Sequence, residues 1–156
     1  VERAIDFLTA SNRKSFGDAV PEFDTGRLNA SGKKVVVIGG RGQLGHIFVD
    51  LFQRSQYHVE VLEENDWPNS DTILADAGIV IVAVPIRLTT GVIEKLTQLP
   101  SSCILADVTS VKESPIDEMM KVHQGPVLGL HPMFGPDTSG LIKQTIIACD
   151  GREPKQ

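Results

Sequence analysis

A glycine-rich run is the first feature of this chain whose spacing could do chemistry. Residues 40–45 read GRGQLG, a G-x-G-x-x-G pattern that follows an apolar stretch and precedes an amphipathic one. In such a loop we expect Gly40 to permit a tight turn, Gly42 to leave room for a pyrophosphate, and Gly45 to let a helix pack closely on a strand. The alternative is that the glycines serve only the turn.

Two neighbouring features bear on the nature of the ligand. The amides of Gln43 and Leu44 should open a helix, whose positive end favours a bound phosphate. Glu63 lies about 20 residues further on, where a carboxylate can bind ribose hydroxyls and repel a 2′-phosphate. We therefore expect NAD in preference to NADP, although Arg41 in the first turn could help to hold a 2′-phosphate. The alternative for Glu63 is a solvated loop acid.

A second group of polar residues follows later apolar runs. His131 stands after residues 127–130 and before Pro132, which holds it extended. An imidazole can accept a proton or strong hydrogen bond near neutral pH, as oxidation of an alcohol or dienol requires. Ser110 could orient this histidine or a nicotinamide amide, and Lys112 could pair with a substrate carboxylate or cofactor phosphate. The alternatives are a structural histidine, a turn-forming hydroxyl and an ordinary loop lysine.

The apolar runs predict the strands that must bring these residues together. Runs typical of strands buried on both faces lie at residues 35–38, 59–62, 79–84, 103–108, 127–130 and 145–149. Alternation with helical segments implies βαβ units. We predict an α/β fold with a doubly wound, mostly parallel sheet of the Rossmann dinucleotide-binding type, in the order 3-2-1-4-5-6. Ligands bind outside the carboxyl ends of such strands, which adds Val84 and Pro85 to the expected cofactor contacts.

The helices between the strands are predicted from apolar stripes and end signals. One stripe comprises Leu44, Ile47, Phe48, Leu51 and Phe52, and the next comprises Leu88, Val92, Ile93, Leu96 and Leu99. A later helix is expected to be capped by Ser114, with Pro115 in its first position. The Cys149–Arg152 segment is expected to form a turn.

Bulk properties exclude several classes of partner. A chain of 156 residues is long enough for one domain with a core but short for a two-domain enzyme. Its net charge of -5 and lack of basic runs argue against a nucleic-acid or anionic-membrane partner. No apolar stretch approaches the roughly 20 residues that span a bilayer. We expect Cys103 and Cys149 to be buried thiols rather than disulfide or catalytic residues, in a reducing and hence cytoplasmic compartment. No metal is expected.

Several of these motifs together resemble the prephenate dehydrogenase family. The resemblance is to the dehydrogenase half of bifunctional chorismate mutase/prephenate dehydrogenases, and it covers about residues 34–156. It is carried by residues 35–45, 63–67, 84–86, Ser110-Val111-Lys112 and, above all, Leu128-Gly-Leu-His-Pro-Met-Phe-Gly-Pro136. The glycine loop is shared by many dehydrogenases, whereas the Ser-Val-Lys and His-Pro-Met-Phe-Gly motifs are much more specific.

The resemblance implies a reaction and a role for each matching residue. The reaction is NAD-dependent oxidative decarboxylation of prephenate to 4-hydroxyphenylpyruvate in tyrosine biosynthesis, driven by loss of carbon dioxide and aromatisation. His131 would accept the hydrogen bond of the ring hydroxyl. Ser110 would align that histidine and the nicotinamide, and Lys112 would lie near substrate and cofactor.

The sequence also departs from the family pattern. The family continues into an all-helical domain that dimerises and supplies arginines for the prephenate carboxylates, whereas this sequence stops at Gln156. Residues 1–33 show no recognisable mutase domain and are interpreted as a linker or upstream tail. We therefore expect residues 34–156 to be the dinucleotide-binding domain without the helical domain, inactive alone and homodimeric only in a full-length protein.

Two alternatives to this function remain at the level of sequence. One is an arogenate dehydrogenase, which uses the aminated substrate. The other is a dinucleotide-binding module that senses or regulates without chemistry. A sensor needs the glycine loop but has no need of His131, Ser110 and Lys112.

Overall fold

The computed structural model describes residue 19 and residues 33–55, 57–135 and 144–152. Within these residues, six strands form one sheet in the order β2-β1-β3-β4-β5-β6. The strands are β1 (Lys34–Ile38), β2 (His58–Leu62), β3 (Ala77–Val82), β4 (Ile104–Asp107), β5 (Val127–Pro132) and β6 (Ile146–Arg152). The helices are α3 (Gln43–Arg54), α4 (Ser70–Leu74), α5 (Ile86–Ile93) and α6 (Glu113–Val122), with a 3-10 helix η1 (Glu64–Asn69). The predicted doubly wound, mostly parallel class is confirmed, because only β6 runs antiparallel to its neighbour.

The predicted strand order was wrong. We expected the third strand outside the second, but β3 pairs with β1 on the side opposite β2, with Val36 beside Val80. Burial explains the difference. β2 presents His58 and Glu60 among partly exposed positions, as suits an edge strand. β3 is almost wholly buried and needs a neighbour on each side.

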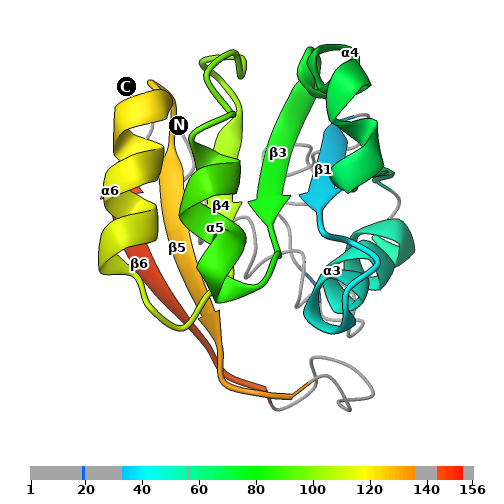
Figure 1. The fold of residues 1–156 in the computed structure, drawn as a ribbon. Coiled ribbons are helices and arrows are strands. Elements are labelled where there is room, and N and C mark those ends of the chain that lie inside the picture. Colours follow the sequence, from blue (N-terminus) through cyan, green and yellow to red (C-terminus); the bar gives the residue numbers. More distant parts are fainter. Residues whose placement is uncertain (1–18, 20–32, 56, 136–143, 153–156) are drawn as a thin grey trace.

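The observed order creates a crevice at the site end of the sheet. The chain leaves β1 towards β2 on one side, and it leaves β3 towards β4 on the other. Such a topological switch point is where open α/β sheets bind ligands, and the order that begins 2-1-3-4-5 places it between β1 and β3. The carboxyl ends of these strands lie at the lower edge of the sheet in Figure 1.

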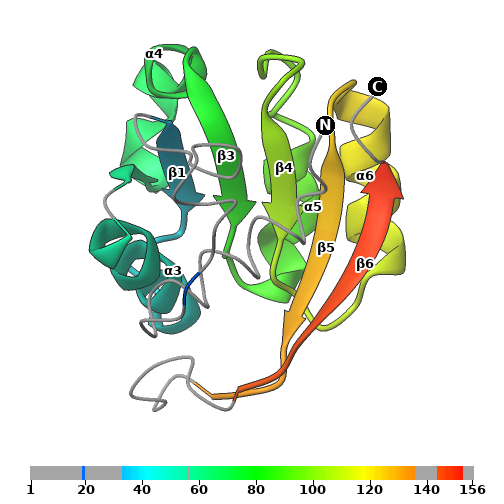
Figure 2. The same ribbon diagram turned by 180° about the vertical axis from the view of Figure 1, so that it is seen from behind.

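Two apolar cores hold this sheet in place, one on each face. Successive side chains of β1 point to opposite faces, so Val35 and Val37 pack on the face that carries Phe48 and Phe52 of α3. Val36 belongs to the second core, together with Ile93 at the end of α5, Leu96 just beyond that helix, and Met119 of α6. Figures 1 and 2 show α5 and α6 on one face of the sheet and α3 on the other.

The structure differs from three local predictions. The face of α5 towards the core presents Thr89, which is fully buried, while Leu88 is 49% exposed. Lys112 rather than Ser114 occupies the N-cap of α6, since that helix begins at Glu113. The segment from Cys149 to Arg152 is strand rather than turn.

The contacts of Arg152 explain why residues 149–152 form a strand. Arg152 donates through its guanidinium to the carbonyls of Met120, at 2.9 Å, and His123. These carbonyls lie at the C-terminal end of α6, where the helix leaves carbonyls without intrahelical partners and a cation is favourable. β6 therefore continues as far as the residue that caps α6.

Both cysteines are free thiols, and the predicted burial is confirmed for Cys103 but wrong for Cys149. Burial raises the pKa of Cys103 to about 12, whereas Cys149 is partly exposed on β6. Since the thiolate is the reactive species, we expect iodoacetamide at pH 8 to leave Cys103 unmodified in the folded chain and to alkylate it after unfolding in guanidinium. Peptide mass spectrometry measures both states. Equal labelling of Cys103 before and after unfolding would show that its strand is not buried.

Candidate dinucleotide and substrate site

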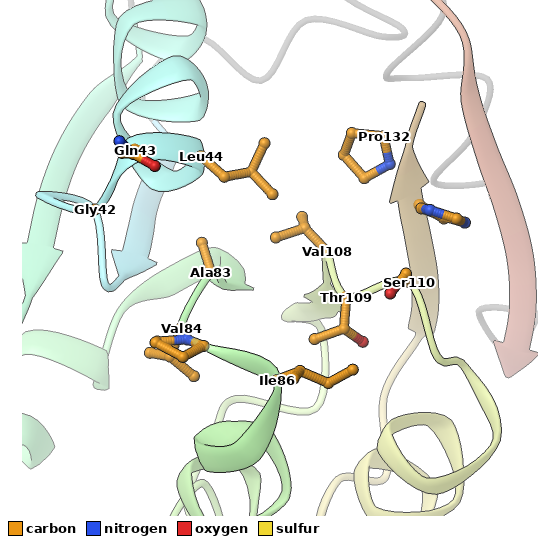
Figure 3. Close-up of a pocket in the computed structure, with 12 residues that line it drawn as sticks. Gly42, Gln43, Leu44, Ala83, Val84, Ile86, Val108, Thr109, Ser110 and Pro132 are labelled. Carbon is orange, nitrogen blue, oxygen red and sulfur yellow. The ribbon is translucent and has the colours of Figure 1, made fainter. Parts of the chain in front are cut away.

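Two adjoining cavities occupy the crevice at the carboxyl end of β1 and β3. One has a volume of about 400 Å³ and the other about 560 Å³. They share four lining residues: Gly42, Ala83, Val84 and Pro85. The smaller cavity, shown in Figure 3, is enclosed by side chains from the start of α3, the β3–α5 loop, the β4–α6 loop and the end of β5. The arrangement suits a long ligand that passes the glycine loop and has one end in each cavity.

The glycine loop makes its turn one residue earlier than predicted. Gly39, with a φ of 78°, adopts the left-handed conformation that side chains disfavour, and sequence reasoning had assigned the tight turn to Gly40. A Cβ on Gly40 would instead lie 2.9 Å from a methyl carbon of Val61. A Cβ on Gly45 would collide with the Gly39 carbonyl oxygen, so Gly45 permits the predicted close approach of α3. The pair of adjacent glycines at 39 and 40 was the feature of the sequence that could have indicated a turn at Gly39.

The N-terminus of α3 is open to an anion. Gly42 is the N-cap, with no capping side chain and no acidic residue in the first turn. Its own amide is engaged by the Gly39 carbonyl at 3.0 Å. Gln43 and Leu44 follow as the first helical residues, whose amides have no intrahelical acceptor. Both residues line the smaller cavity, so free donors and the helix dipole meet at the place predicted for a pyrophosphate.

Glu63 lines the larger cavity and is connected directly to the glycine loop. One carboxylate oxygen accepts a hydrogen bond from the backbone amide of Arg41 at 2.8 Å. The amide of Glu63 donates in turn to Asp66 at 2.9 Å. The Glu63 side chain also forms a capping box with Asp66, so these contacts hold the carboxylate at the cavity wall. The side chain of Arg41 lines neither cavity.

An aromatic ring and two cations complete the larger cavity. Trp67 lies in its wall, and the ammonium of Lys95 sits 4.8 Å from the centre of the indole ring. Arg87 also lines it, from the first turn of α5. A flat, partly apolar wall beside a carboxylate suits an adenosine group, with base against the ring and ribose near Glu63.

The predicted catalytic residues separate into two groups. His131 of β5 is half-buried, and Ser110 is exposed. Both line the smaller cavity, so the fold brings them to the same cavity as Gly42, Gln43 and Leu44. The other histidines lie elsewhere: His46 and His58 are exposed, and His123 is buried beside the Cys103 carbonyl at 2.7 Å.

Lys112 does not line either cavity. Its ammonium is 2.6 Å from Asp107 Oδ2 and 2.6 Å from the carbonyl oxygen of Leu130. Desolvation lowers its pKa, and the neighbouring Asp107 carboxylate opposes that shift. Contact of Lys112 with a substrate or cofactor remains a prediction. Asp107 and Thr109, which sequence reasoning missed, join it in a network behind the cavity wall.

Other kinds of site are not found in the part of the chain that the structure describes. Among those residues there is no group of three or more histidine, cysteine, aspartate or glutamate side chains that could hold a metal ion. None of the described helices is sufficiently long and apolar to cross a membrane.

The fold and these cavities define a nucleotide-binding domain of the doubly wound α/β class. The model of the family described as prephenate dehydrogenase, nucleotide-binding domain, matches residues 52–146. The chain therefore belongs to the prephenate dehydrogenase family, as its motifs predicted.

Relatives agree with this membership, and a solved structure shares the fold. The chain is 47% identical to the T-protein of Enterobacter agglomerans, over 94% of this chain and 37% of the relative. It is 42% identical to the T-protein of Haemophilus influenzae, over 97% of this chain and 40% of the relative. The chain thus spans well under half the length of either. A prephenate dehydrogenase structure from Aquifex aeolicus, in complex with hydroxyphenyl propionate and NAD+, shares the fold at 18% identity and a TM-score of 0.56, covering 77% of this chain and 51% of that one.

Proposed function

We propose that this chain is the cofactor-binding half of an enzyme that oxidatively decarboxylates prephenate to 4-hydroxyphenylpyruvate with NAD, in tyrosine biosynthesis. One observation carries the proposal: a single cavity joins the open N-terminus of α3 to His131 and Ser110. A module that only sensed a dinucleotide would need the helix terminus without the histidine. Family membership and the T-protein relatives support the choice of reaction.

The residues present fit a dinucleotide that spans both cavities. The amides of Gln43 and Leu44 would hold the pyrophosphate, where Gly42 keeps the approach clear. Glu63 and Trp67 would hold the adenosine in the larger cavity. Bound there, NAD would supply the hydride acceptor for the oxidation. The solved Aquifex aeolicus structure that shares this fold was determined with NAD+.

His131 and Ser110 would act on the substrate from the opposite wall of the smaller cavity. An imidazole there can accept the hydrogen bond of the ring hydroxyl and take up its proton as the carbonyl forms. The hydroxyl of Ser110 can orient the imidazole or the carboxamide of the cofactor. The apolar side chains of Ile86 and Val108 line the same cavity.

Substrate carboxylates would need partners from outside this cavity. No arginine or lysine is among the residues that line it, although a dicarboxylate is bound best by such cations. We therefore propose that the helical domain expected from the family resemblance supplies them, and that this chain alone turns over poorly.

A chimera tests the proposed reaction. This chain would replace the matching 147 residues of the Enterobacter agglomerans T-protein, and formation of NADH and 4-hydroxyphenylpyruvate would be followed. Turnover of prephenate supports the proposal. A folded, NAD-binding chimera that is inert towards prephenate, or one that turns over arogenate alone, would contradict it.

Glu63 provides a prediction about cofactor choice. Glu63→Gln should weaken NAD binding by about tenfold, because a carboxylate accepts ribose hydrogen bonds more strongly than an amide. NADP should gain affinity, because the charge that repels its 2′-phosphate is removed. Calorimetric titration of the chain measures both constants, with Asp71→Asn, an exposed change of equal charge on α4, as the matched control. If the ratio of the NAD and NADP dissociation constants is unchanged, Glu63 does not select the cofactor and only accepts the hydrogen bond of the Arg41 amide.

A further inference from the structure

The carboxylate of Asp107 lies behind the smaller cavity, at the end of β4, and is completely buried. One of its oxygens, Oδ2, accepts hydrogen bonds from the backbone amide of Thr109 at 3.0 Å and from the Thr109 hydroxyl at 2.5 Å. The same oxygen pairs with the ammonium of Lys112 at 2.6 Å. The other, Oδ1, has no hydrogen-bond partner among the described residues. Removing one partner of a buried ion pair leaves the other charge uncompensated, so Asp107 and Lys112 depend on each other.

The hydrogen bonds of Asp107 shape one wall of the cavity. Thr109 and Ser110 both line it, on the loop that leaves β4 (Figure 3). Because Asp107 accepts from the amide and the hydroxyl of Thr109, the chain must turn immediately after the strand. The backbone direction at Ser110 is set by that turn.

Lys112 links the same carboxylate to β5, the strand next to β4. The pairing of β4 with β5 ends where Asp107 lies beside Gly129, one residue before Leu130. Beyond that point the ammonium of Lys112 donates to the Leu130 carbonyl, at 2.6 Å. It thereby takes the place of the next ladder hydrogen bond and holds the peptide that leads into His131.

Gly129 makes room for this bridge. A Cβ built on Gly129 would lie 2.8 Å from Cδ1 of Ile116 and 2.9 Å from Cδ of Lys112, so a side chain there would displace both. The stem crosses β5 at that position, and the side chain of Lys112 is only 15% exposed. The bridge is therefore an internal brace between the β4–α6 loop and β5.

We propose that Asp107 is the positioning residue of the smaller cavity. Its single carboxylate holds Ser110 through Thr109 and His131 through Lys112. Ser110, which would face the nicotinamide, and His131, which would face the substrate, therefore keep a fixed separation. Asp107 touches no ligand itself. This inference rests on the proposed function, because it assigns the smaller cavity to the nicotinamide half of NAD.

A comparison of NAD with ADP-ribose tests the assignment. ADP-ribose keeps the adenosine, the pyrophosphate and both riboses but has no nicotinamide ring. Asp107→Asn and Lys112→Met should each weaken NAD binding to this chain by about tenfold and leave ADP-ribose within about twofold of the unchanged chain. The double variant should lose no more than either single variant, because both residues act through one bridge.

A second ion pair, which lies on α6, provides the matched control. Glu118 and Lys121 of α6 pair at 2.8 Å, but Lys121 is 69% exposed. Glu118→Gln and Lys121→Met should change neither affinity. Circular dichroism checks folding of every variant, and the double variant leaves no unpaired buried charge if a single variant unfolds.

The outcomes separate the two proposals. A chain that binds neither NAD nor ADP-ribose contradicts the proposed function itself. If the unchanged chain binds both and the folded variants lose both equally, Asp107 is a general structural residue and the inference is overturned. Unaltered NAD binding by the folded double variant, or additive losses in the two single variants, would also overturn it.

Discussion

His131→Asn is expected to lower kcat for prephenate oxidation by roughly 10²–10⁴-fold, the range that a positioned acid–base group contributes. Asparagine is close in polarity but cannot take up a proton, so the ring hydroxyl would lose its acceptor as the carbonyl forms. His131 lies at the wall opposite the glycine loop and belongs to neither the helix terminus nor the adenosine cavity. NAD affinity should therefore stay within about twofold.

The T-protein chimera gives the setting for this measurement, with kcat from NADH formation and NAD affinity from calorimetry. His58→Asn is the matched control, because His58 is exposed at the N-terminal end of β2, lines neither cavity and pairs with Glu60. Retained turnover in His131→Asn would remove the catalytic assignment. Loss of NAD binding in parallel with turnover would indicate that the histidine holds the cofactor instead.

Gly42→Ala is expected to weaken NAD binding by about 100-fold, equivalent to about 2.7 kcal/mol. Gly42 is the N-cap of α3 and lines both cavities, so a methyl group there would occupy the space through which the pyrophosphate approaches the amides of Gln43 and Leu44. The fold should tolerate the change. The new Cβ would be 3.2 Å from the Gly39 carbonyl oxygen, which requires a shift of only a few tenths of an ångström.

Thermal unfolding and NAD titration of the same samples distinguish a blocked site from a damaged fold. Gly135→Ala is the control, because Gly135 is exposed and a Cβ there would meet nothing within 4 Å. A Gly42→Ala chain that melts with the unchanged chain and still binds NAD at full affinity would place the pyrophosphate elsewhere.

The elements of this fold were predictable because burial leaves a clear pattern in the sequence. β1 and β3 are continuous apolar runs, and α3 carries an apolar stripe at helical spacing, so both types of element could be assigned. Strand order was not predictable in the same way. It depended on β2 being an edge strand, and a partly polar five-residue segment such as His58–Leu62 shows this only once its neighbours are known.

In the candidate site, too, some residues could be recognised from the local sequence and others could not. The position of Gly42, Glu63, Ser110 and His131 at the cavities could be predicted, because each lies at or beyond the carboxyl end of an apolar run. The role of Asp107 depends on contacts across the sheet, with Lys112 and through it with Leu130. A buried aspartate at the end of an apolar run carries no local sign of such contacts.

Gly39 illustrates a finer limit. The G-x-G-x-x-G pattern directs attention to its own first glycine, but the left-handed residue is the glycine before it. The choice between two adjacent glycines is set by where β1 ends and α3 begins, and such boundaries are not specified by composition.

Titration of this chain with NAD and NADP, followed by the fluorescence of Trp67, tests NAD binding across the β1–β3 crevice most directly. Trp67 is the only tryptophan of the chain and lies in the wall of the larger cavity, where Lys95 covers its ring. We predict a saturable change in emission, with a lower Kd for NAD than for NADP. Tighter binding of NADP, or no change with either dinucleotide in a chain shown by circular dichroism to be folded, would contradict the assignment.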